Sequence, residues 1–394
     1  TFHGIAHRLL RMHWQEAGLQ ENFQILDADD QHRILRRLIK EEDLDEGQWP
    51  ARQAQWFINA RKDEGQRPAA VEHMDNPLTA QWLRIYEIYQ AYCDRASLVD
   101  FADLLLYAHE LWLNQPTLLQ HYRQRLTHLL VDEFQDTNAI QYAWIRMLAG
   151  HSGSTLVVGD DDQSIYGWRG AQVENVKHFV RDFSDVKTIK LEQNYRSSGN
   201  ILEAANALIA HNEDRMGKKL WTADGEGEPI TLYSAFNEQD EARYVIEQVE
   251  QWLARGRRAE EVAIVYRTTA QSRLFEEYLL RASVAYRVYG GQRFFERAEI
   301  KDALAYLRLL QNPNDDAAME RVINAPARGI GQKTLSILRL QARESRLPLW
   351  AAAQECIKQN LLPARAKAAV GDFVQLVAGM HERMADWTLG NQMQ

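Results

Sequence analysis

The chain has 394 residues and a net charge of −9, with hydrophobic residues at 45% and charged residues at 26%. These values are typical of a globular protein with about two to four domains, and they exclude a disordered or fibrous chain. No run of about 18 apolar residues is present, so we expect no membrane span and no membrane partner. The excess of acidic residues excludes a uniformly basic surface but leaves room for a local basic groove that binds nucleic acid.

The two cysteines predict neither a metal site nor a disulfide framework. Cys93 and Cys356 lie far apart in the sequence and lack the paired spacing that zinc ligands have. We therefore expect the protein in a reducing cytoplasm.

The first 126 residues predict mostly helices. Ile34, Leu35, Leu38 and Ile39 recur at helical spacing. A second apolar set has the same spacing and comprises Leu104, Leu105, Ala108, Leu111 and Trp112. The acidic run over residues 41–46 lies between these sets and predicts a solvent-exposed turn.

From about residue 127 the pattern changes to alternating strands and helices. The apolar runs predict strands at residues 126–131, 155–158, 187–191, 230–233 and 262–266. Helical periodicity predicts helices at residues 140–148, 201–209 and 242–253. Ser197 or Ser198 is a candidate cap for the second of these helices. Alternation of this kind predicts the α/β fold class, with a parallel sheet covered by helices.

The last part of the chain again predicts helices. A polar, glycine-rich stretch at 224–229 predicts a loop within the α/β part. After Gly290 and Gly291, helical periodicity predicts helices at residues 300–310, 331–343 and 364–384.

Carboxylates follow two of the predicted strands at the point where each strand ends. Asp132 and Glu133 come directly after the first predicted strand, and Asp160 follows the second. Adjacent Asp and Glu residues at such an end can hold Mg²⁺ and activate a water beside a nucleotide. The alternative is a plain strand end before a helix start, where acidic residues are favoured in any case. Gln135, Asp136 and the second acidic strand end favour the nucleotide site.

The second acidic stretch continues into aromatic and glycine residues. Gln163 can sense the γ-phosphate of a nucleotide or orient a water. Tyr166 and Trp168, beside Arg169, suit a stacking platform for unpaired bases. The alternative is that both rings pack beneath a loop as core aromatics.

A third segment follows the predicted strand at 187–191. Arg196 lies just past that strand end, where a guanidinium can neutralise charge on a transferring phosphoryl group. Tyr195, the preceding residue, can stack on a base. The alternative for Arg196 is an ion pair with a surface carboxylate.

Together these stretches resemble a known family, the UvrD/Rep/PcrA-type DNA helicases of superfamily 1. Their motifs II, III and IV closely resemble V-D-E-F-Q-D, G-D-D-D-Q-S-I-Y-G-W-R-G-A and L-E-Q-N-Y-R-S-S of this chain. Their motifs Ib and IVa resemble T-F-H-G-I-A-H-R-L-L-R and Y-G-G-Q-R-F-F-E-R-A-E-I-K-D-A-L. The motifs occur in the family's order over nearly the whole chain, so the resemblance is far more specific than any single motif.

The resemblance implies an α/β architecture of two RecA-like P-loop NTPase domains, both incomplete here, each with a helical insertion domain. By analogy, the helical 1B insertion covers residues 2–126, and the C-terminal part of the RecA-like 1A domain covers 127–192. The N-terminal part of the RecA-like 2A domain covers 193–289, and the N-terminal part of the helical 2B domain covers 290–394.

The resemblance also implies ATP and Mg²⁺ as cofactors and assigns roles to single residues. Asp132 and Glu133 match the Mg²⁺ site, with Glu133 as the catalytic base. Gln163 matches the γ-phosphate sensor, Arg196 a γ-phosphate arginine and Tyr195 the adenine-stacking tyrosine. The residues that match contacts to single-stranded DNA are Thr1, Phe2, His3, Tyr166 and Trp168.

A glycine-containing element near the start of the 331–343 helix predicts a second DNA contact. Two glycines around an aliphatic residue let backbone N–H groups approach a phosphate at a helix N-terminus. The segment from Ala327 to Arg346 has five basic residues against one acid. It resembles a helix-hairpin-helix-like element of 2B that grips the duplex backbone without reading sequence. The alternative is a plain turn, and the candidate DNA contacts are Arg328, Gly329, Gly331, Lys333 and Thr334.

The sequence departs from the family at both ends. It lacks the phosphate-binding loop with its Lys and Ser/Thr, motif Ia, and motifs V and VI. We therefore expect an internal fragment that exposes sheet edges and does not hydrolyse ATP at a useful rate by itself.

For the parent protein the resemblance implies an ATP-dependent 3′→5′ DNA helicase. Its expected partners are single-stranded DNA, single/double-strand junctions and repair proteins, in DNA repair and replication-fork maintenance. We expect it in the cytoplasm, associated with the nucleoid. Two alternatives stay open: the helicase subunit of a RecB/AddA-type helicase–nuclease, and a non-catalytic DNA-binding module. A phosphate-binding loop encoded upstream would favour an enzyme over the second alternative.

Overall fold

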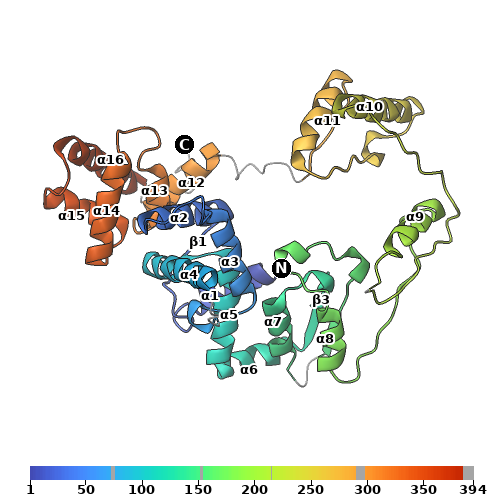
Figure 1. The fold of residues 1–394 in the computed structure, drawn as a ribbon, viewed down its shortest axis with the longest axis horizontal. Coiled ribbons are helices and arrows are strands. Elements are labelled where there is room, and N and C mark those ends of the chain that lie inside the picture. The colour runs from blue at the N-terminus through green and yellow to red at the C-terminus, as the bar shows by residue number, and fades with distance from the viewer. Residues whose placement is uncertain (72–75, 151–153, 214, 290–297, 385–394) are drawn as a thin grey trace. The chain divides into compact units, whose positions relative to one another are not determined.

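The structure is a computed structural model that describes residues 1–71, 76–150, 154–213, 215–289 and 298–384 (Figure 1). The chain forms two compact units. The first unit comprises residues 1–189, 214–216 and 304–394, and the second comprises 190–213 and 217–303. In the ranges that the structure describes, every helix is too short or too polar to cross a membrane.

The N-terminal part of the first unit is helical, as predicted. Its helices are α1 (Phe2–Met12), α2 (Ala28–Glu41), α3 (Ala51–Asp63), α4 (Pro77–Ala96), α5 (Phe101–Asn114) and α6 (Pro116–Arg125). A short parallel pair, β1 (Gln24–Ile25) with β2 (Leu98–Val99), lies among them. The apolar sets predicted on α2 and α5 are buried, and the acidic run after α2 forms a turn.

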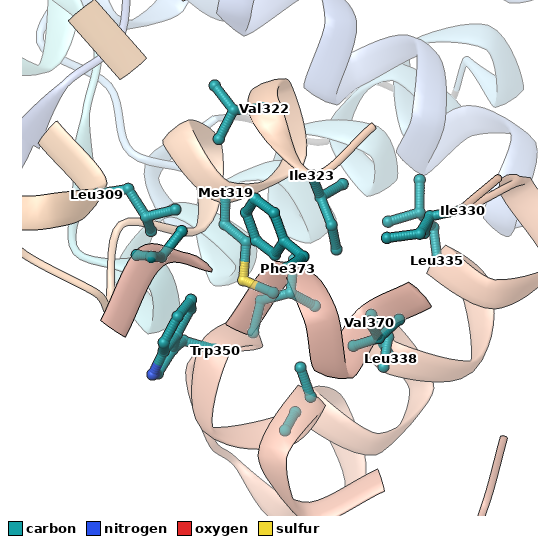
Figure 2. Packing of buried hydrophobic residues seen from close by; sticks show 14 of the residues in the cluster. Leu309, Met319, Val322, Ile323, Ile330, Leu335, Leu338, Trp350, Val370 and Phe373 are labelled. Atoms are coloured by element: carbon teal, nitrogen blue, oxygen red, sulfur yellow. The ribbon is translucent and has the colours of Figure 1, made fainter. Parts of the chain in front are cut away.

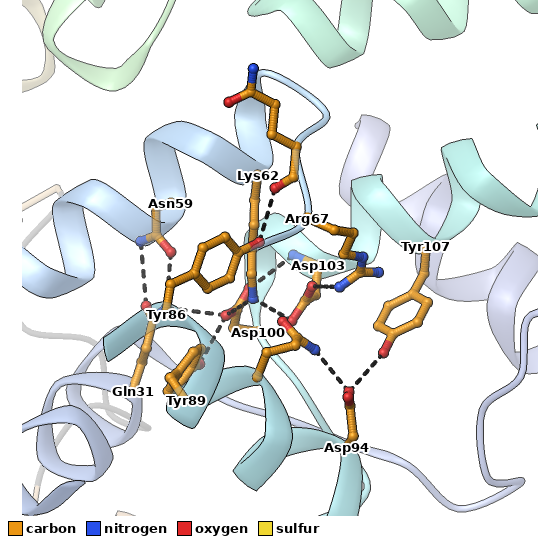
Figure 3. A network of polar contacts seen from close by, with 12 residues as sticks. Gln31, Asn59, Lys62, Arg67, Tyr86, Tyr89, Asp94, Asp100, Asp103 and Tyr107 are labelled. Carbon is orange, nitrogen blue, oxygen red and sulfur yellow. Dashed lines mark hydrogen bonds and ion pairs between the residues drawn. The ribbon is translucent and has the colours of Figure 1, made fainter. Parts of the chain in front are cut away.

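A buried ion-pair network ties α3 to α5 (Figure 3). The ammonium of Lys62 lies 2.7 Å from Asp100 Oδ2 and 2.5 Å from Asp103 Oδ2. Tyr89 donates a hydrogen bond to Asp100 at 2.8 Å, and Arg67 pairs with Asp103 at 2.8 Å. Removing one partner of a buried pair costs about 3–5 kcal/mol, because the remaining charge is left without compensation. The network therefore fixes the C-terminal turn of α3 in the helical layer.

The α/β part of the first unit is built on two parallel strands, β3 (His128–Val131) and β4 (Ser154–Val157). Their register runs from His128 opposite Ser154 to Val131 opposite Val157. Helices α7 (Ala139–Ala149) and α8 (Asn175–Asp182) supply Tyr142, Ile145 and Phe179 to a core with Val131 and Phe134. The sequence predictions of both strands, of the 140–148 helix and of the α/β class are confirmed.

Three strand predictions are wrong. Residues 187–191, 230–233 and 262–266 have the apolar pattern of strands, but no described segment pairs with them in a ladder. Leu191 remains 79% exposed and Leu232 94% exposed. The physical reason is that a strand exists only where a neighbour satisfies its backbone hydrogen bonds. The second unit has helices α9 (Gly199–Ile209), α10 (Glu238–Ala254) and α11 (Thr269–Arg281), of which α11 was not predicted.

Two local predictions in the second unit hold. Ser198 occupies the cap position of α9, although its side chain makes no capping hydrogen bond with any described residue. Residues 224–229 form a loop, and Gly225 and Gly227 there have φ values of +79° and +74°. The glycine pair Gly290–Gly291, predicted as a boundary, lies outside the described residues.

The C-terminal helices pack around an apolar core (Figure 2). They are α12 (Ala298–Gln311), α13 (Asp316–Val322), α14 (Gln332–Ser345), α15 (Leu349–Lys358) and α16 (Ala364–Met384), and they confirm the three predicted helices. Met319, Leu338 and Phe373 are fully buried in this core. Replacing Phe373 with Ala would lower the free energy of unfolding by about 3–5 kcal/mol, because the surrounding side chains fill the resulting cavity only partly.

Ion pairs join α2 to α13 and α14 within the first unit. Glu320 pairs with Arg37 and with Arg339, whose Nε lies 2.9 Å from Glu320 Oε1. Burial acts to raise the pKa of Glu320, but the guanidiniums of Arg37 and Arg339 outweigh it and hold that pKa below its ordinary value. Glu320 is therefore charged, and together with Glu41, which lies 3.6 Å from Arg37 and 3.8 Å from Arg339, it balances the charges of the two arginines.

Candidate active site at the carboxyl ends of β3 and β4

A buried amide joins the two acidic strand ends. Because β3 and β4 are parallel, Asp132 and Glu133 leave the sheet at the same edge as Asp160. Gln135 donates from Nε2 to Glu133 Oε2 at 2.8 Å, and its Oε1 accepts from the backbone N–H of Asp160 at 2.9 Å. Gln135 is 1% exposed, so its amide is shielded from water, whereas the Glu133 carboxylate that it holds is exposed. The sequence predicted the acids but missed the bridge, which a buried Gln within an acidic stretch could have indicated.

Glu133 has a strained backbone. Its φ of +51° lies in the left-handed region, which is uncommon for a residue other than glycine. Asp132 and Glu133 are nonetheless exposed, and Asp132 Oδ1 accepts from the N–H of Glu133 at 2.9 Å.

Gly159 permits the close approach of the two strand ends. A Cβ at this position would lie 2.7 Å from Gln135 Oε1 and 3.2 Å from the backbone nitrogen of Phe134. The first contact is closer than a Cβ atom can come and the second is tight, so a side chain here would push the Gln135 bridge aside. The signal in the sequence is a glycine placed between an apolar strand and its terminal carboxylates.

The oxygen atoms at this edge fit a hard divalent cation. Mg²⁺ prefers carboxylate oxygens, and the exposed Asp132 and Glu133 offer them side by side. Asp160, Asp161 and Asp162 also lie within reach of one another. Two of these are engaged elsewhere, because Asp161 accepts from the N–H of Met216 and Asp162 pairs with the guanidinium of Arg215. The pair Asp132 and Glu133 also accepts hydrogen bonds, but from within the acidic edge, and it stays our candidate metal site.

Gln163 lies at the same edge. Its Nε2 donates to Asp160 Oδ2 at 2.8 Å, and its side chain is exposed. The predicted residues Asp132, Glu133 and Gln163 thus belong to one connected edge, which we call the acidic edge.

The loop after the acidic edge presents aromatic rings. Trp168 is 70% exposed and Tyr166 is half-buried, with ring centroids 6.5 Å apart. The guanidinium of Arg169 lies 4.8 Å from the Tyr166 ring and 4.6 Å from the Trp168 ring. The alternative of core aromatics is therefore wrong for Trp168, whose face can stack on a base.

Two residues that the sequence analysis missed attach this aromatic loop to the acidic edge. The carbonyl of Thr137 accepts from the backbone N–H of Gln172 and from Asn175 Nδ2, both at 2.9 Å. Thr137 and Asn175 are buried. A single polar residue in a loop or at a helix start carries no periodic signal, so only burial in the fold reveals these two.

The predicted DNA contacts at the start of the chain are built into α1. Thr1 caps this helix by accepting from the N–H of Gly4 at 3.2 Å. Phe2 packs edge-on against Trp144 at 6.3 Å, and His3 against Phe101 at 5.8 Å. Burial lowers the pKa of His3, so its ring is neutral at physiological pH.

Tyr195 and Arg196 belong to the second unit. Asn194 Oδ1 accepts from the backbone N–H groups of Arg196 at 2.9 Å and Ser197 at 2.8 Å, which forms a tight turn. Tyr195 is 78% exposed, and Arg196 is exposed as well. Their nucleotide-binding roles stay predictions.

The glycine element before α14 has the predicted glycines, but one of its predicted basic DNA contacts is engaged inside the unit. Gly329 has a φ of +75°, and Gly331 precedes the first residue of α14 with open space around it. Arg328 donates to the carbonyl of Val322 at 3.0 Å and to the hydroxyl of Tyr306 at 2.6 Å. Its guanidinium is therefore engaged inside the unit.

The basic surface near α14 is also smaller than its composition indicated. Arg339 pairs with Glu320, and Thr334 is buried. The basic side chains that remain exposed are Lys333, Arg343 and Arg346.

Comparison with known proteins decides the family. The UvrD/REP helicase N-terminal domain matches residues 1–184, and the UvrD-like helicase C-terminal domain matches residues 189–359. The chain belongs to the UvrD/REP helicase family.

Several relatives within this family match almost the whole chain. It is 59% identical over 389 residues to DNA helicase II of Escherichia coli strain K12, which covers 99% of this chain and 54% of the relative. It is 54% identical over 389 residues to DNA helicase II of Haemophilus influenzae, covering 99% of this chain and 53% of the relative. It is 41% identical over 383 residues to ATP-dependent DNA helicase PcrA of Leuconostoc citreum, covering 97% and 51%. The chain thus spans about half the length of the curated relatives it matches.

Proposed function

We propose that the protein to which this chain belongs is an ATP-dependent DNA helicase that moves 3′→5′ on single-stranded DNA. The observation that carries this proposal is the connection of the acidic edge to a loop that exposes Trp168. An edge that suits Mg²⁺ and water activation is joined by hydrogen bonds to a platform that suits unpaired bases. The names of the relatives, DNA helicase II and PcrA, support it and favour a helicase over a helicase–nuclease subunit.

In this proposal the residues of the acidic edge divide the chemistry of ATP hydrolysis. Mg²⁺, when bound through Asp132 and Glu133, neutralises charge on the phosphates. Glu133 accepts the proton of the attacking water, and Gln135 holds the Glu133 carboxylate in place through the bond at 2.8 Å. Gln163 orients the γ-phosphate or the water. Tyr195 would stack on the adenine, and Arg196 would neutralise the charge that develops on the transferred phosphoryl group.

We further propose the family's domain arrangement for this chain. The 1B insertion would cover 2–126 and the 1A part 127–192, followed by the 2A part at 193–289 and the 2B part at 290–394. The exposed start of α14 at Gly331 would contact the duplex backbone beside a junction. Repair and replication-fork maintenance in the cytoplasm, near the nucleoid and with repair proteins, would be the setting.

A chimera tests the function, because the chain spans about half of its relatives. In it, this chain replaces the matching 389 residues of DNA helicase II from Escherichia coli strain K12. We expect ATP hydrolysis that single-stranded DNA stimulates, and unwinding of a duplex with a 3′ tail. A chimera that binds ATP and DNA but shows neither activity would refute the proposed helicase.

Glu133→Gln in the same chimera tests the catalytic base. Loss of a general base lowers turnover by about 10²–10⁴-fold, while ATP and DNA binding should persist. Binding of a fluorescent ATP analogue and of labelled oligonucleotide provides the control. Unchanged turnover would remove Glu133 from this role.

A further inference from the structure

A carboxylate of the helical layer is hydrogen-bonded next to the acidic edge and lies near the end of the aromatic loop. Asp63, the last residue of α3, accepts a hydrogen bond at Oδ1 from Asn138 Nδ2 at 2.9 Å. Its Oδ2 lies 3.7 Å from the place that a Cβ on Gly170 would take. Asn138 follows the acidic edge in sequence, and Gly170 ends the loop that carries Trp168. One side chain of the helical layer therefore lies close to both the start of α7 and the aromatic loop.

Asn138 is held at both ends of its amide. Its Oδ1 caps α7 by accepting from the N–H of Gln141 at 3.0 Å, and its Nδ2 donates to Asp63. Gln141 Oε1 in turn accepts from the N–H of Asn138 at 3.1 Å, which completes a capping box. The preceding residue, Thr137, holds the aromatic loop through Gln172. A shift of Asn138 would therefore reach the loop and the acids together.

The position of Asp63 is electrostatically unfavourable. A negative charge in the last residue of a helix meets the negative end of the helix dipole. Burial, and then the nearby charge of Asp100, raise the pKa of Asp63 to about 7. In the part of the chain that the structure describes, no Lys, Arg or His side chain forms an ion pair with Asp63; Lys62 pairs with Asp100 and Asp103 instead. Stability alone would not favour an acid here, whereas a positioning role would.

We propose that Asp63 is a positioning residue that couples DNA at the Trp168 loop to water activation at Glu133. The inference rests on the proposed helicase function. The buried Lys62 network fixes the end of α3, so Asp63 holds Asn138 at a constant distance from the helical layer. When bases bind and displace the aromatic loop, the loop pulls on Thr137. Because Asp63 holds the neighbouring Asn138 in place, the start of α7 does not give way, and the displacement reaches the acidic edge.

The first test measures the ratio of DNA-stimulated to unstimulated ATP hydrolysis in the chimera. Asp63→Ala should lower this ratio about fivefold or more, the range of a typical coupling between two sites. Asp63→Asn should restore it to within about twofold, because the amide oxygen still accepts from Asn138. Glu64→Gln is the matched control, since Glu64 lies next in sequence and pairs with Arg61 at 2.8 Å.

A purely structural role of Asp63 predicts a different result. Both rates would then fall by the same factor and leave the ratio unchanged, and that outcome would overturn the proposal. A wild-type chimera without DNA-stimulated hydrolysis would instead refute the helicase function itself. The two failures are therefore distinguishable.

The partner side of the contact provides a second test. Asn138→Ser keeps a good helix cap but removes the amide donor to Asp63. Combining it with Asp63→Ala should lower the ratio no further than the stronger single variant, because both changes remove the same contact. Losses that multiply would show independent effects and contradict the coupling.

Hydrogen exchange tests the contact between Asp63 and Asn138 without an activity measurement. The backbone N–H of Gln172 is bonded to the carbonyl of Thr137, so Asp63→Ala should speed its exchange by about fivefold or more. The amide of Val131 in β3 and the Glu64→Gln variant serve as controls and should not change. Unchanged exchange at Gln172 in Asp63→Ala would show that Asp63 does not hold the loop.

Discussion

The acidic edge and the glycine element before α14 were both predicted as binding sites from short motifs, yet the fold treats their side chains differently. At the acidic edge, Asp132 and Glu133 stay exposed, while Gln135 orients Glu133 through a bridge that was not predicted. Before α14, Arg328 donates to internal acceptors and Arg339 pairs with Glu320. A charge in a motif thus contributes to binding only where the fold leaves it available. In our proposal the first site depends on oriented side chains, and the second on an exposed backbone.

The largest expected effect concerns the ion pairs of Glu320 with Arg37 and Arg339. Glu320→Ala removes the more buried of the two carboxylates that Arg37 and Arg339 share, and leaves them only Glu41, at 3.6 and 3.8 Å. It should lower the free energy of unfolding by about 3 kcal/mol, the low end of the range for a broken buried pair. The pKa of Glu320 is held below its ordinary value in the folded state. The wild type is therefore stabilised by this charge at pH values above the ordinary pKa, and it loses that stabilisation as the pH falls toward the folded-state pKa. Urea unfolding measures the difference in unfolding free energy between the wild type and Glu320→Ala, and this difference should be smaller at pH 4 than at pH 7. An equal difference at both pH values would mean that the charge of Glu320 is not what stabilises the wild type.

The next effect tests whether the acidic edge depends on close packing. Gly159→Ala places a Cβ 2.7 Å from Gln135 Oε1 and displaces the bridge to Glu133. A misplacement of about 1 Å at a catalytic group can cost about 100-fold in rate, so ATP turnover in the chimera should fall by that order. Gly371→Ala, at a helical glycine with open space around it, is the control. Normal turnover in Gly159→Ala would show that the bridge is dispensable.

A smaller effect tests whether the second site depends on its backbone. Gly331→Val shields the first N–H groups of α14, and a Cβ there meets nothing within 4 Å, so the fold should tolerate it. Loss of one hydrogen bond to a charged phosphate should weaken duplex binding by roughly tenfold. Fluorescence anisotropy with duplex and single-stranded oligonucleotides measures the difference. Equal losses on both substrates would contradict a duplex-specific contact.

The same two regions show how far the sequence could predict the structure. Helices such as α2, α5 and α16 were predictable, because their apolar spacing alone determines which face is buried. Asp132, Glu133 and Trp168 were predictable as candidates, because their residue types follow apolar runs or glycines in a dense motif. These candidates are now part of one connected geometry.

What the sequence could not predict depends on contacts between distant residues. The strand pattern at 187–191 was misleading, because strand formation requires a partner that no local pattern specifies. The engagement of Arg328 by Val322 and Tyr306 was equally hidden. The Asp63 contact joins residues 75 positions apart and has no periodic signal.

The smallest effect concerns Asp63, which links the acidic edge to the helical layer. Its pKa is raised to about 7 by burial, by Asp100 and by Glu64, against the opposing hydrogen bond from Asn138. Between its ordinary pKa and 7 the folded state binds more protons than the unfolded state, so stability falls as pH rises through this window and levels off above about 8. Asp63→Asn lacks this titration. From pH 6 to pH 8 the wild type should therefore lose about 1 kcal/mol relative to Asp63→Asn. Urea midpoints of both chains at pH 6, 7 and 8 measure the difference, and parallel pH profiles would show that Asp63 does not titrate in this range.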